Sequence, residues 1–171
     1  MKIKNIFITA LAALSLTSCM DLEPVSSISD SKYWKDQAQF AAFNVGLQGL
    51  FREKSFQFYE WGELRTNLYA GTPFSGEAVH YKNLFNNTPN ATTSEVTDFG
   101  GVYTIINQIN LMISHTENTD VLNEAQRKTY LGAAYGMRAY LYFHLLRTYG
   151  KAVLGLEYTT GNKVDISNMG K

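Results

Sequence analysis

The sequence is poor in the residues on which most enzyme and metal chemistry depends. It has one cysteine and three scattered histidines in 171 residues. A lone cysteine cannot form an intrachain disulfide, and no Cys/His cluster has the spacing of a zinc site. The sequence also lacks a glycine-rich phosphate loop, an HExxH motif and a nucleophile elbow. We therefore predict no cofactor, no metal site and no catalytic residue, and we do not expect an enzyme.

The charge has no excess of either sign. Lys and Arg total 15, and Asp and Glu also total 15. A nucleic-acid-binding surface would need a broad positive field, so we expect no nucleic-acid partner. Hydrophobic residues make up 45% of the chain and aromatic residues 13%. This composition indicates a folded domain with its own core.

The first residues have the pattern of a targeting segment. Lys2 and Lys4 precede an apolar run from Ile6 to Leu16, which is too short to span a bilayer as a helix. The run ends in Leu16-Thr17-Ser18-Cys19, which resembles the lipobox of bacterial lipoproteins. We expect residues 1–18 to be removed and Cys19 to carry the lipid that anchors the protein to the membrane. The alternative is an ordinary secretory signal that happens to contain a cysteine.

A tether and a first helix should follow the anchor. Residues 19–35 contain Pro24, show no helical period and read as an extended tether with a short turn. Asp36 can cap a helix, with Gln39 in the position of a capping box. The helix should run to about Lys54, with one apolar stripe formed by Phe40, Phe43, Leu47, Leu50 and Phe51.

The clearest element is a long helix from Glu124 to Tyr149. Asn123 can cap its start, with Gln126 able to return the hydrogen bond, and Gly150 suits a left-handed C-cap. Its apolar stripe consists of Leu131, Ala134, Tyr135, Leu141, Tyr142, Leu145 and Tyr149. A helix this long and this rich in aromatic residues needs other helices to cover it.

A second long helix should precede it, capped by Asp98 and running to about His115. Its stripe includes Asn110, which we predict to be a buried hydrogen-bonding group between helices. Arg138 lies on the stripe of the later helix and has two interpretations. Its stem can pack while its head reaches the surface, or its head can be buried against a carboxylate or carbonyl oxygens.

These helices carry a family resemblance. The stretch from Ala133 to Leu154 is similar to a signature of the SusD/RagB family of outer-membrane nutrient-binding lipoproteins. The chain matches that signature at Arg138, Ala139, Tyr142, Phe143, Leu145, Tyr149 and Gly150. It departs at Ala133, where the family often has Glu, and at Val153, where it often has Pro. Phe99 stands where the family often has Trp.

The resemblance implies an all-α fold with tetratricopeptide-like helix packing and a long irregular aromatic-rich segment. Residues 36–156 would be the N-terminal helical domain, and 157–171 an irregular tail. It covers only the N-terminal third of a family member, so we expect a piece of a longer protein. The implied function is a lipid-anchored protein on the outer face of the outer membrane that binds a glycan or a related nutrient and passes it to a SusC-like TonB-dependent transporter. The alternative is a helical module that docks on such a transporter without binding ligand.

Residues 55–97 have no long helical period but many aromatic residues. Rings beside amides and guanidinium groups suit sugar binding, yet the same composition suits a protein interface or simple packing. The resemblance points to Tyr69, Phe74 and Tyr81 as ligand-binding residues, and Asn86 is a further amide candidate. We expect Trp61 to be packed and residues 88–95 to form an exposed connector.

Overall fold

The computed structural model describes residues 32–66, 68 and 81–160. The chain divides into a unit of residues 1–34 and a unit of residues 35–171. In the first unit, the rings of Tyr33 and Trp34 meet edge to face, with their centroids 5.0 Å apart. Cys19 and the tether up to residue 31 lie outside the described residues, so lipidation stays a prediction.

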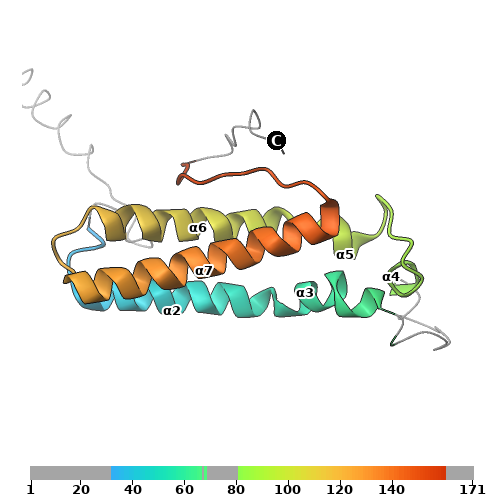
Figure 1. The fold of residues 1–171 in the computed structure, drawn as a ribbon, viewed down its shortest axis with the longest axis horizontal. Coiled ribbons are helices and arrows are strands. Elements are labelled where there is room, and N and C mark those ends of the chain that lie inside the picture. Colours follow the sequence, from blue (N-terminus) through green and yellow to red (C-terminus); the bar gives the residue numbers. More distant parts are fainter. Residues whose placement is uncertain (1–31, 67, 69–80, 161–171) are drawn as a thin grey trace, which may run out of the picture. The chain divides into compact units, whose positions relative to one another are not determined.

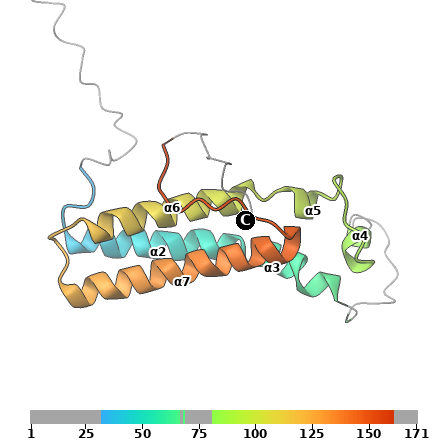
Figure 2. The ribbon, with the colours of Figure 1, turned by 45° about the horizontal axis from the view of Figure 1, so that its top comes forward.

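The described part of the second unit is built from helices, which confirms the predicted all-α class. In chain order they are α2 (Gln37–Glu53), α3 (Ser55–Trp61), the 3-10 helix η1 (Glu63–Arg65), α4 (Lys82–Phe85), α5 (Ser94–Thr97), α6 (Gly100–Glu117) and α7 (Glu124–Tyr149). The three long helices α2, α6 and α7 lie side by side (Figure 1). A turned view shows the short helices α4 and α5 gathered near the C-terminal end of α7 (Figure 2).

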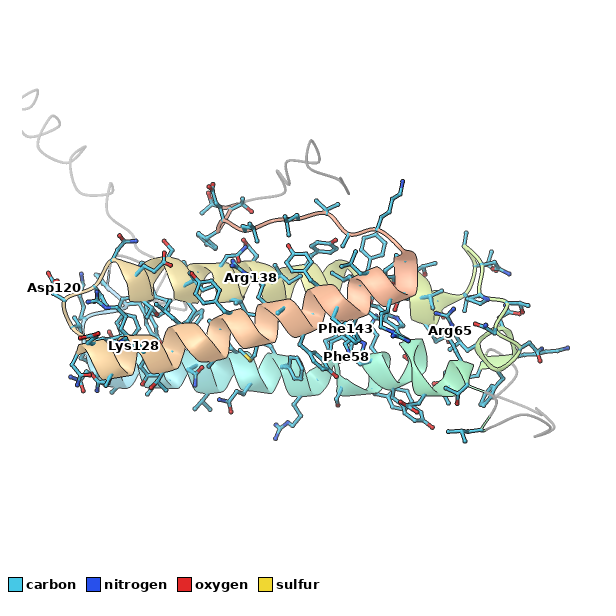
Figure 3. All side chains as sticks on the ribbon, viewed as in Figure 1. Phe58, Arg65, Asp120, Lys128, Arg138 and Phe143 are labelled. Carbon is cyan, nitrogen blue, oxygen red and sulfur yellow. The ribbon has the colours of Figure 1, made fainter. Side chains whose placement is uncertain are left out.

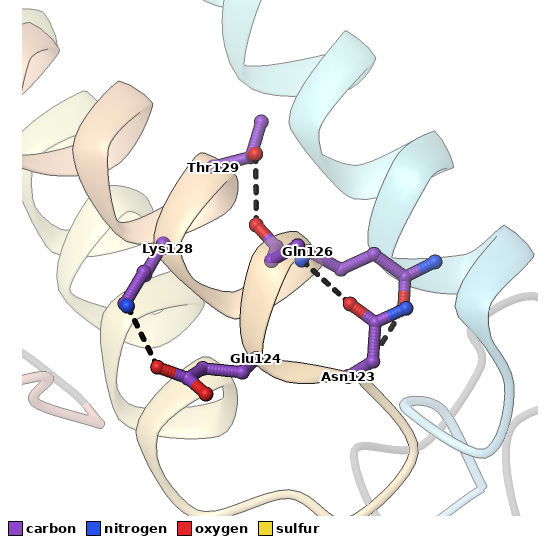
Figure 4. Close-up of polar contacts among 6 residues, drawn as sticks. Asn123, Glu124, Gln126, Lys128 and Thr129 are labelled. Atoms are coloured by element: carbon purple, nitrogen blue, oxygen red, sulfur yellow. Dashed lines mark hydrogen bonds and ion pairs between the residues drawn. The ribbon is translucent and has the colours of Figure 1, made fainter.

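Helix α7 begins and ends at the predicted residues. Asn123 Oδ1 accepts from the Gln126 backbone N–H at 2.9 Å, and Gln126 Oε1 accepts from the Asn123 N–H at 3.0 Å (Figure 4). Gly150 closes the helix at φ 73°, in the left-handed region that glycine adopts without a steric penalty. Glu124 and Lys128 add a surface ion pair at 2.6 Å in the first turns.

Helix α2 also follows the sequence, with two differences. Asp36 Oδ1 caps Gln39 as predicted, but Gln39 Oε1 accepts from the Lys35 N–H instead of the Asp36 N–H. Leu50 was placed on the buried stripe, yet 36% of its surface is exposed. At about 100° per residue, Leu50 lies roughly 80° from fully buried Phe40, which puts it at the edge of the stripe.

The predicted start of α6 is wrong. Asp98 does not cap the helix, which begins at Gly100 with no side-chain cap and ends at Glu117. Asp98 instead closes the short helix α5, because its N–H donates to the Ser94 carbonyl at 3.3 Å. Its own carbonyl accepts a hydrogen bond from the Gln57 side chain. A helix that the sequence pattern did not reveal therefore uses the residue expected to begin the next one.

The core lies where the three long helices meet. It is made of large apolar side chains with almost no exposed surface: Phe40, Leu47, Val102, Ile106, Ile109, Met112, Leu141 and Leu145. Burial of such side chains stabilises the fold by about 1.5–3 kcal/mol each. The buried residues of the predicted stripes of α6 and α7 face each other and form the main packing interface of the described unit. Tyr135 was predicted on the stripe of α7, but it is 41% exposed.

The described part of the segment predicted to be irregular, residues 55–66, 68 and 81–97, contains the short helices α3, η1, α4 and α5. Trp61 is buried, as predicted. The prediction that residues 88–95 form an exposed connector is wrong in part, because Thr93 is buried and α5 begins at Ser94. Thr93 Oγ1 accepts from the Asn90 N–H at 3.1 Å, which folds the connector back on itself. Local side-chain to backbone bonds of this kind leave no periodic signal.

Candidate ligand site

Arg138 is held by neutral oxygens between α7 and the segment that follows it. Its Nη1 donates to Asn110 Oδ1 at 2.7 Å and to the Leu156 carbonyl at 3.1 Å. The guanidinium carbon also lies 5.1 Å from the centre of the Tyr135 ring. The side chain is half-buried. Of the two interpretations of this residue, the structure therefore shows a head clamped by amide and carbonyl oxygens.

Asn110, on α6, connects α6 to α7 and to the segment that follows α7. It is buried, and its Nδ2 donates to the carbonyls of Gly155 and Glu157, both at 3.0 Å. Its Oδ1 accepts from Arg138. Every strong hydrogen-bonding atom of the side chain is therefore used, as a buried amide requires.

Further side chains of α6 and α7 hold the backbone of residues 153–159. Tyr142 Oη accepts from the Gly155 N–H at 2.7 Å and donates to its carbonyl at 2.9 Å. Asn107 binds Thr159 in the same double way, with both distances at 2.9 Å. Tyr103 Oη accepts from the Val153 N–H at 2.8 Å. We call Tyr103, Asn107, Asn110, Arg138 and Tyr142 the clamp.

The segment expected to be a loop-like tail is thus fastened to two helices through Thr159. The main-chain groups that the clamp binds are chiefly those of alternate residues, at 153, 155, 157 and 159. An extended chain directs the N–H and C=O of alternate residues to the same side. The clamp side chains therefore take the place that a neighbouring strand would occupy, and their polar groups bind the main chain of this segment.

A concavity of about 330 Å³ lies elsewhere, at the end of the helical unit near α4 and α5. Its wall comes from η1, the connector before α5, α5 with the residues after it, and the last turn of α7. The lining residues are Arg65, Pro89, Asn90, Ala91, Val96, Thr97, Phe99, Thr148 and Tyr149. The volume falls within the range of small-molecule sites.

Aromatic side chains fix one wall of this concavity. Tyr149 Oη donates to the Val96 carbonyl at 2.5 Å, and Trp61 Nε1 donates to the Glu95 carbonyl at 2.7 Å. The Tyr149 ring also meets the rings of Trp61 and Phe99, with centroids 5.4 and 5.5 Å away. Burial, aided by the nearby negative charge of Asp98, raises the pKa of Tyr149 to about 12. Tyr149 is therefore a neutral donor at physiological pH, and it supports α5.

Arg65 supplies the charge of the concavity (Figure 3). Its Nε and Nη2 both donate to Asn87 Oδ1, at 3.1 and 3.0 Å. Asn87 has φ 51°, a left-handed conformation that asparagine tolerates better than most residues. The turn at Asn87 therefore aims its amide oxygen at the guanidinium and holds Arg65 in place.

The lining suits binding better than catalysis. The Phe99 ring is 46% exposed and lies in the same wall as the amide of Asn90 and the guanidinium of Arg65. A sugar can stack its C–H face on such a ring while amide and guanidinium groups fix its hydroxyls. The nine lining residues include no carboxylate, histidine or cysteine that could act as a general base or nucleophile.

Of the ligand residues predicted from the sequence, the two that the structure describes, Tyr81 and Asn86, do not line this concavity. Tyr69 and Phe74 lie outside the described residues. Tyr81 is half-buried; its hydroxyl has a raised pKa because of burial first, and then because Glu60 bonds it and Glu95 lies nearby. Asn86 is exposed at the end of α4.

From the sequence, Arg65 was only one of several polar residues among the aromatic side chains of residues 55–97, and Asn90 and Phe99 were not predicted as ligand residues. Two signals were present. Phe99 stands at a position where the resembling family often has Trp, and Arg65 belongs to the Glu63–Asn67 stretch that resembles the family. Neither signal predicts that Arg65 and Phe99 lie in the same wall. Their proximity depends on how the chain between them, which includes α4 and α5, folds.

No group of three or more His, Cys, Asp or Glu side chains within 32–66, 68 and 81–160 could hold a metal ion. Across the same ranges, no helix has both the length and the apolar character needed to cross a membrane.

The chain is similar to known proteins over most of its length. It is 34% identical to SusD-like protein P38 of Formosa agariphila over 161 residues, which are 87% of this chain and 30% of that protein. Among solved structures, NanU of B. fragilis is 53% identical with a TM-score of 0.73, covering 81% of this chain and 28% of that one. A SusD superfamily protein from Bacteroides vulgatus is 50% identical with a TM-score of 0.66, covering 74% and 27%.

The chain thus spans about 30% of the length of the curated relative it matches. The sequence identities to the two solved structures, 53% and 50%, are high, so the similarity extends beyond a shared helical fold. Residues 21–169 match the SusD-like family described as starch-binding and associating with the outer membrane. This chain therefore belongs to the SusD-like family of starch-binding proteins that associate with the outer membrane.

Proposed function

We propose that the protein is a surface-exposed lipoprotein of the outer membrane that binds a glycan or a related nutrient and delivers it to a SusC-like TonB-dependent transporter. The observation that carries the proposal is the concavity of about 330 Å³, lined by an exposed aromatic ring beside a guanidinium and an amide. The membership of the chain in a family of starch-binding proteins supports a saccharide as the ligand.

The roles of the lining residues follow from their positions. Phe99 would stack on a sugar ring, and its contacts with Tyr103 and Tyr149 hold its plane in place. Asn90 and Arg65 would bind hydroxyls. Tyr149 would act indirectly, by fixing α5 through its bond to Val96. Tyr69, Phe74, Tyr81 and Asn86 remain proposed as contacts that extend the site.

Calorimetric titration against a panel of oligosaccharides tests this assignment. Phe99→Ala should weaken binding of a recognised oligosaccharide about tenfold, which corresponds to the 1–2 kcal/mol expected of one contact ring. Phe56→Ala is the matched control, because Phe56 is a similarly exposed ring, 57%, on α3 that does not line the concavity. Equal binding by Phe99→Ala and the wild type would remove Phe99 from the site.

Candidate contacts beyond the concavity can be tested in the same titration. Tyr81→Ala and Phe74→Ala should each weaken binding if the site extends toward residues 69–86. Unchanged affinity in both variants would confine the ligand to the nine lining residues.

An interaction module without a ligand of its own is the second candidate. It is favoured by the apolar surface that α7 leaves exposed, because Phe143 and Leu146 are 52% and 51% exposed. Co-purification with the transporter separates the two functions. A module requires that Phe143→Ser and Leu146→Ser abolish transporter binding, and that no oligosaccharide of the panel binds the protein.

Anchoring is tested separately from ligand binding. The lipobox pattern before Cys19 predicts that the wild type stays with the outer-membrane fraction after a high-salt and carbonate wash. Cys19→Ala should be released or remain unprocessed. Full retention of Cys19→Ala in the membrane fraction would overturn lipidation at this residue.

A further inference from the structure

We propose that the ligand of the concavity is an acidic saccharide, whose carboxylate or sulfate group binds Arg65. This inference rests on the proposed function, since it takes the concavity to be the saccharide site. It names the chemical class of that saccharide from the charge and the free donors of the lining.

The first argument is the charge of the lining. Arg65 is the only ionised side chain among the nine lining residues, and the others are apolar, hydroxyl or amide side chains. In the part of the chain that the structure describes, the guanidinium of Arg65 bonds only the neutral oxygen of Asn87. No carboxylate of the described residues pairs with this half-buried cation, which borders the concavity.

The second argument is the geometry of the guanidinium. A guanidinium has five N–H donors in one plane, and Asn87 Oδ1 takes one from Nε and one from Nη2. The remaining three lie on Nη1 and Nη2, along the edge that forms two parallel bonds with a carboxylate or a sulfate. The left-handed turn at Asn87 holds the plane before a ligand arrives, so little side-chain entropy is lost on binding.

The negative charge of Asp98 gives a separate test of whether the ligand is acidic. Asp98 lies between the lining residues Thr97 and Phe99, and it is exposed. Its charge acts on this wall, because it helps to raise the pKa of Tyr149. An acidic ligand would be repelled by Asp98, whereas a neutral ligand would not. Neutralising Asp98 should therefore strengthen the binding of an acidic saccharide alone.

The experiment compares saccharides that differ only in charge. The purified full chain is titrated with trigalacturonic and triglucuronic acids and with their methyl esters, and a sulfated galacto-oligosaccharide distinguishes sulfate from carboxylate. We expect at least one acidic form to bind at least tenfold more tightly than its neutral counterpart, which is the range of a charge-assisted hydrogen-bond pair. The preference should shrink as the salt concentration rises.

Three variants assign that preference to Arg65. Arg65→Gln should abolish it, and Arg65→Lys should retain part of it. Asp98→Asn should increase affinity for the acid about two- to threefold and leave the ester unchanged. Arg147→Gln is the matched control, because Arg147 lies over the Phe143 ring on α7 and does not line the concavity. If Arg65→Gln fails to fold, the titrations of the wild type and of Asp98→Asn with acids and esters still show whether the preferred ligand is acidic.

Two results would overturn the inference, and they can be told apart. Equal affinity for acids and esters would contradict an acidic ligand and leave saccharide binding in place. Failure of every acidic and neutral saccharide to bind would contradict the proposed function together with this inference.

Discussion

Arg138 and Arg65 show how the same side chain serves two different regions of the molecule. Both are half-buried, and both donate to neutral oxygens. Arg138 joins an amide of α6 to a main-chain carbonyl and lies against the Tyr135 ring. Among the described residues, Arg65 bonds only Asn87, and it borders a concavity of about 330 Å³. We infer that Arg138 supports the fold, whereas Arg65 retains donors for a ligand.

The two regions differ in construction as well. The clamp sits on long helices whose core side chains have almost no exposed surface. The concavity is walled by η1 and α5, which are three and four residues long, and by the connector between them. Helices that short depend on individual bonds, such as those of Trp61 and Tyr149 to the carbonyls of α5. Loss of a single contact should therefore matter for stability in the first region and for binding in the second.

The largest expected effect lies in the helical core. Leu141→Ala should reduce the free energy of unfolding by about 2–5 kcal/mol, because Leu141 is fully buried and the mutation leaves a cavity. Urea denaturation measures the change. Leu146→Ala on the same helix is the matched control, and it should cost less than about 0.5 kcal/mol because Leu146 is exposed. Similar losses in both variants would contradict the assigned faces of α7.

The clamp should give the next largest effect. Asn110→Ala removes three hydrogen bonds and leaves the Gly155 and Glu157 carbonyls without this donor. We expect a loss of about 2–4 kcal/mol in the free energy of unfolding, from the net value of such bonds and the unsatisfied groups left behind. Asn86→Ala, at an exposed amide, should be nearly neutral. A loss below about 0.5 kcal/mol for Asn110→Ala would show that the clamp contributes little.

The long helices could be predicted from the sequence, and the short ones could not. The capping box at Asn123 and the C-cap at Gly150 are local patterns, and they set the bounds of α7 correctly. Asp98 was misassigned because its role depends on α5, a helix of four residues with no measurable period. Helices this short have too few turns for an apolar stripe to repeat.

The same limit applies to the candidate site. Arg65 and Phe99 are far apart in the sequence and meet in one wall only after the connector folds back through Thr93 and Asn90. Two residues of the clamp could be predicted from the sequence, because Asn110 and Arg138 are polar residues on apolar stripes. Their main-chain partners at 155–157 lie in a stretch with no pattern of its own.

A smaller effect should come from one hydroxyl of the clamp. Tyr142→Phe removes the bonds to the Gly155 N–H and carbonyl while keeping the ring. The free energy of unfolding should fall by about 1 kcal/mol. The control is Tyr158→Phe, on an exposed tyrosine of the same extended segment. If both variants unfold at the same urea concentration as the wild type, Tyr142 does not hold the segment.

The smallest expected effect is a pH dependence near the concavity. The pKa of Tyr149 is raised to about 12 from its usual value of 10.0, so the folded state favours the protonated hydroxyl. The stabilisation is complete below pH 10 and is lost as the pH rises toward 12. Tyr149→Phe should therefore flatten the fall in stability between pH 10 and pH 12, measured by urea denaturation. An unchanged slope would mean that other tyrosines account for the fall.

The most direct test of the division between the two regions compares Arg65→Gln with Arg138→Gln in the same two assays. Arg65→Gln should lose at least tenfold in affinity for an acidic oligosaccharide and less than about 0.5 kcal/mol in the free energy of unfolding. Arg138→Gln should lose about 1–3 kcal/mol in the free energy of unfolding, with unchanged affinity in the folded protein. The reverse pattern, with binding lost in Arg138→Gln and stability lost in Arg65→Gln, would contradict the account.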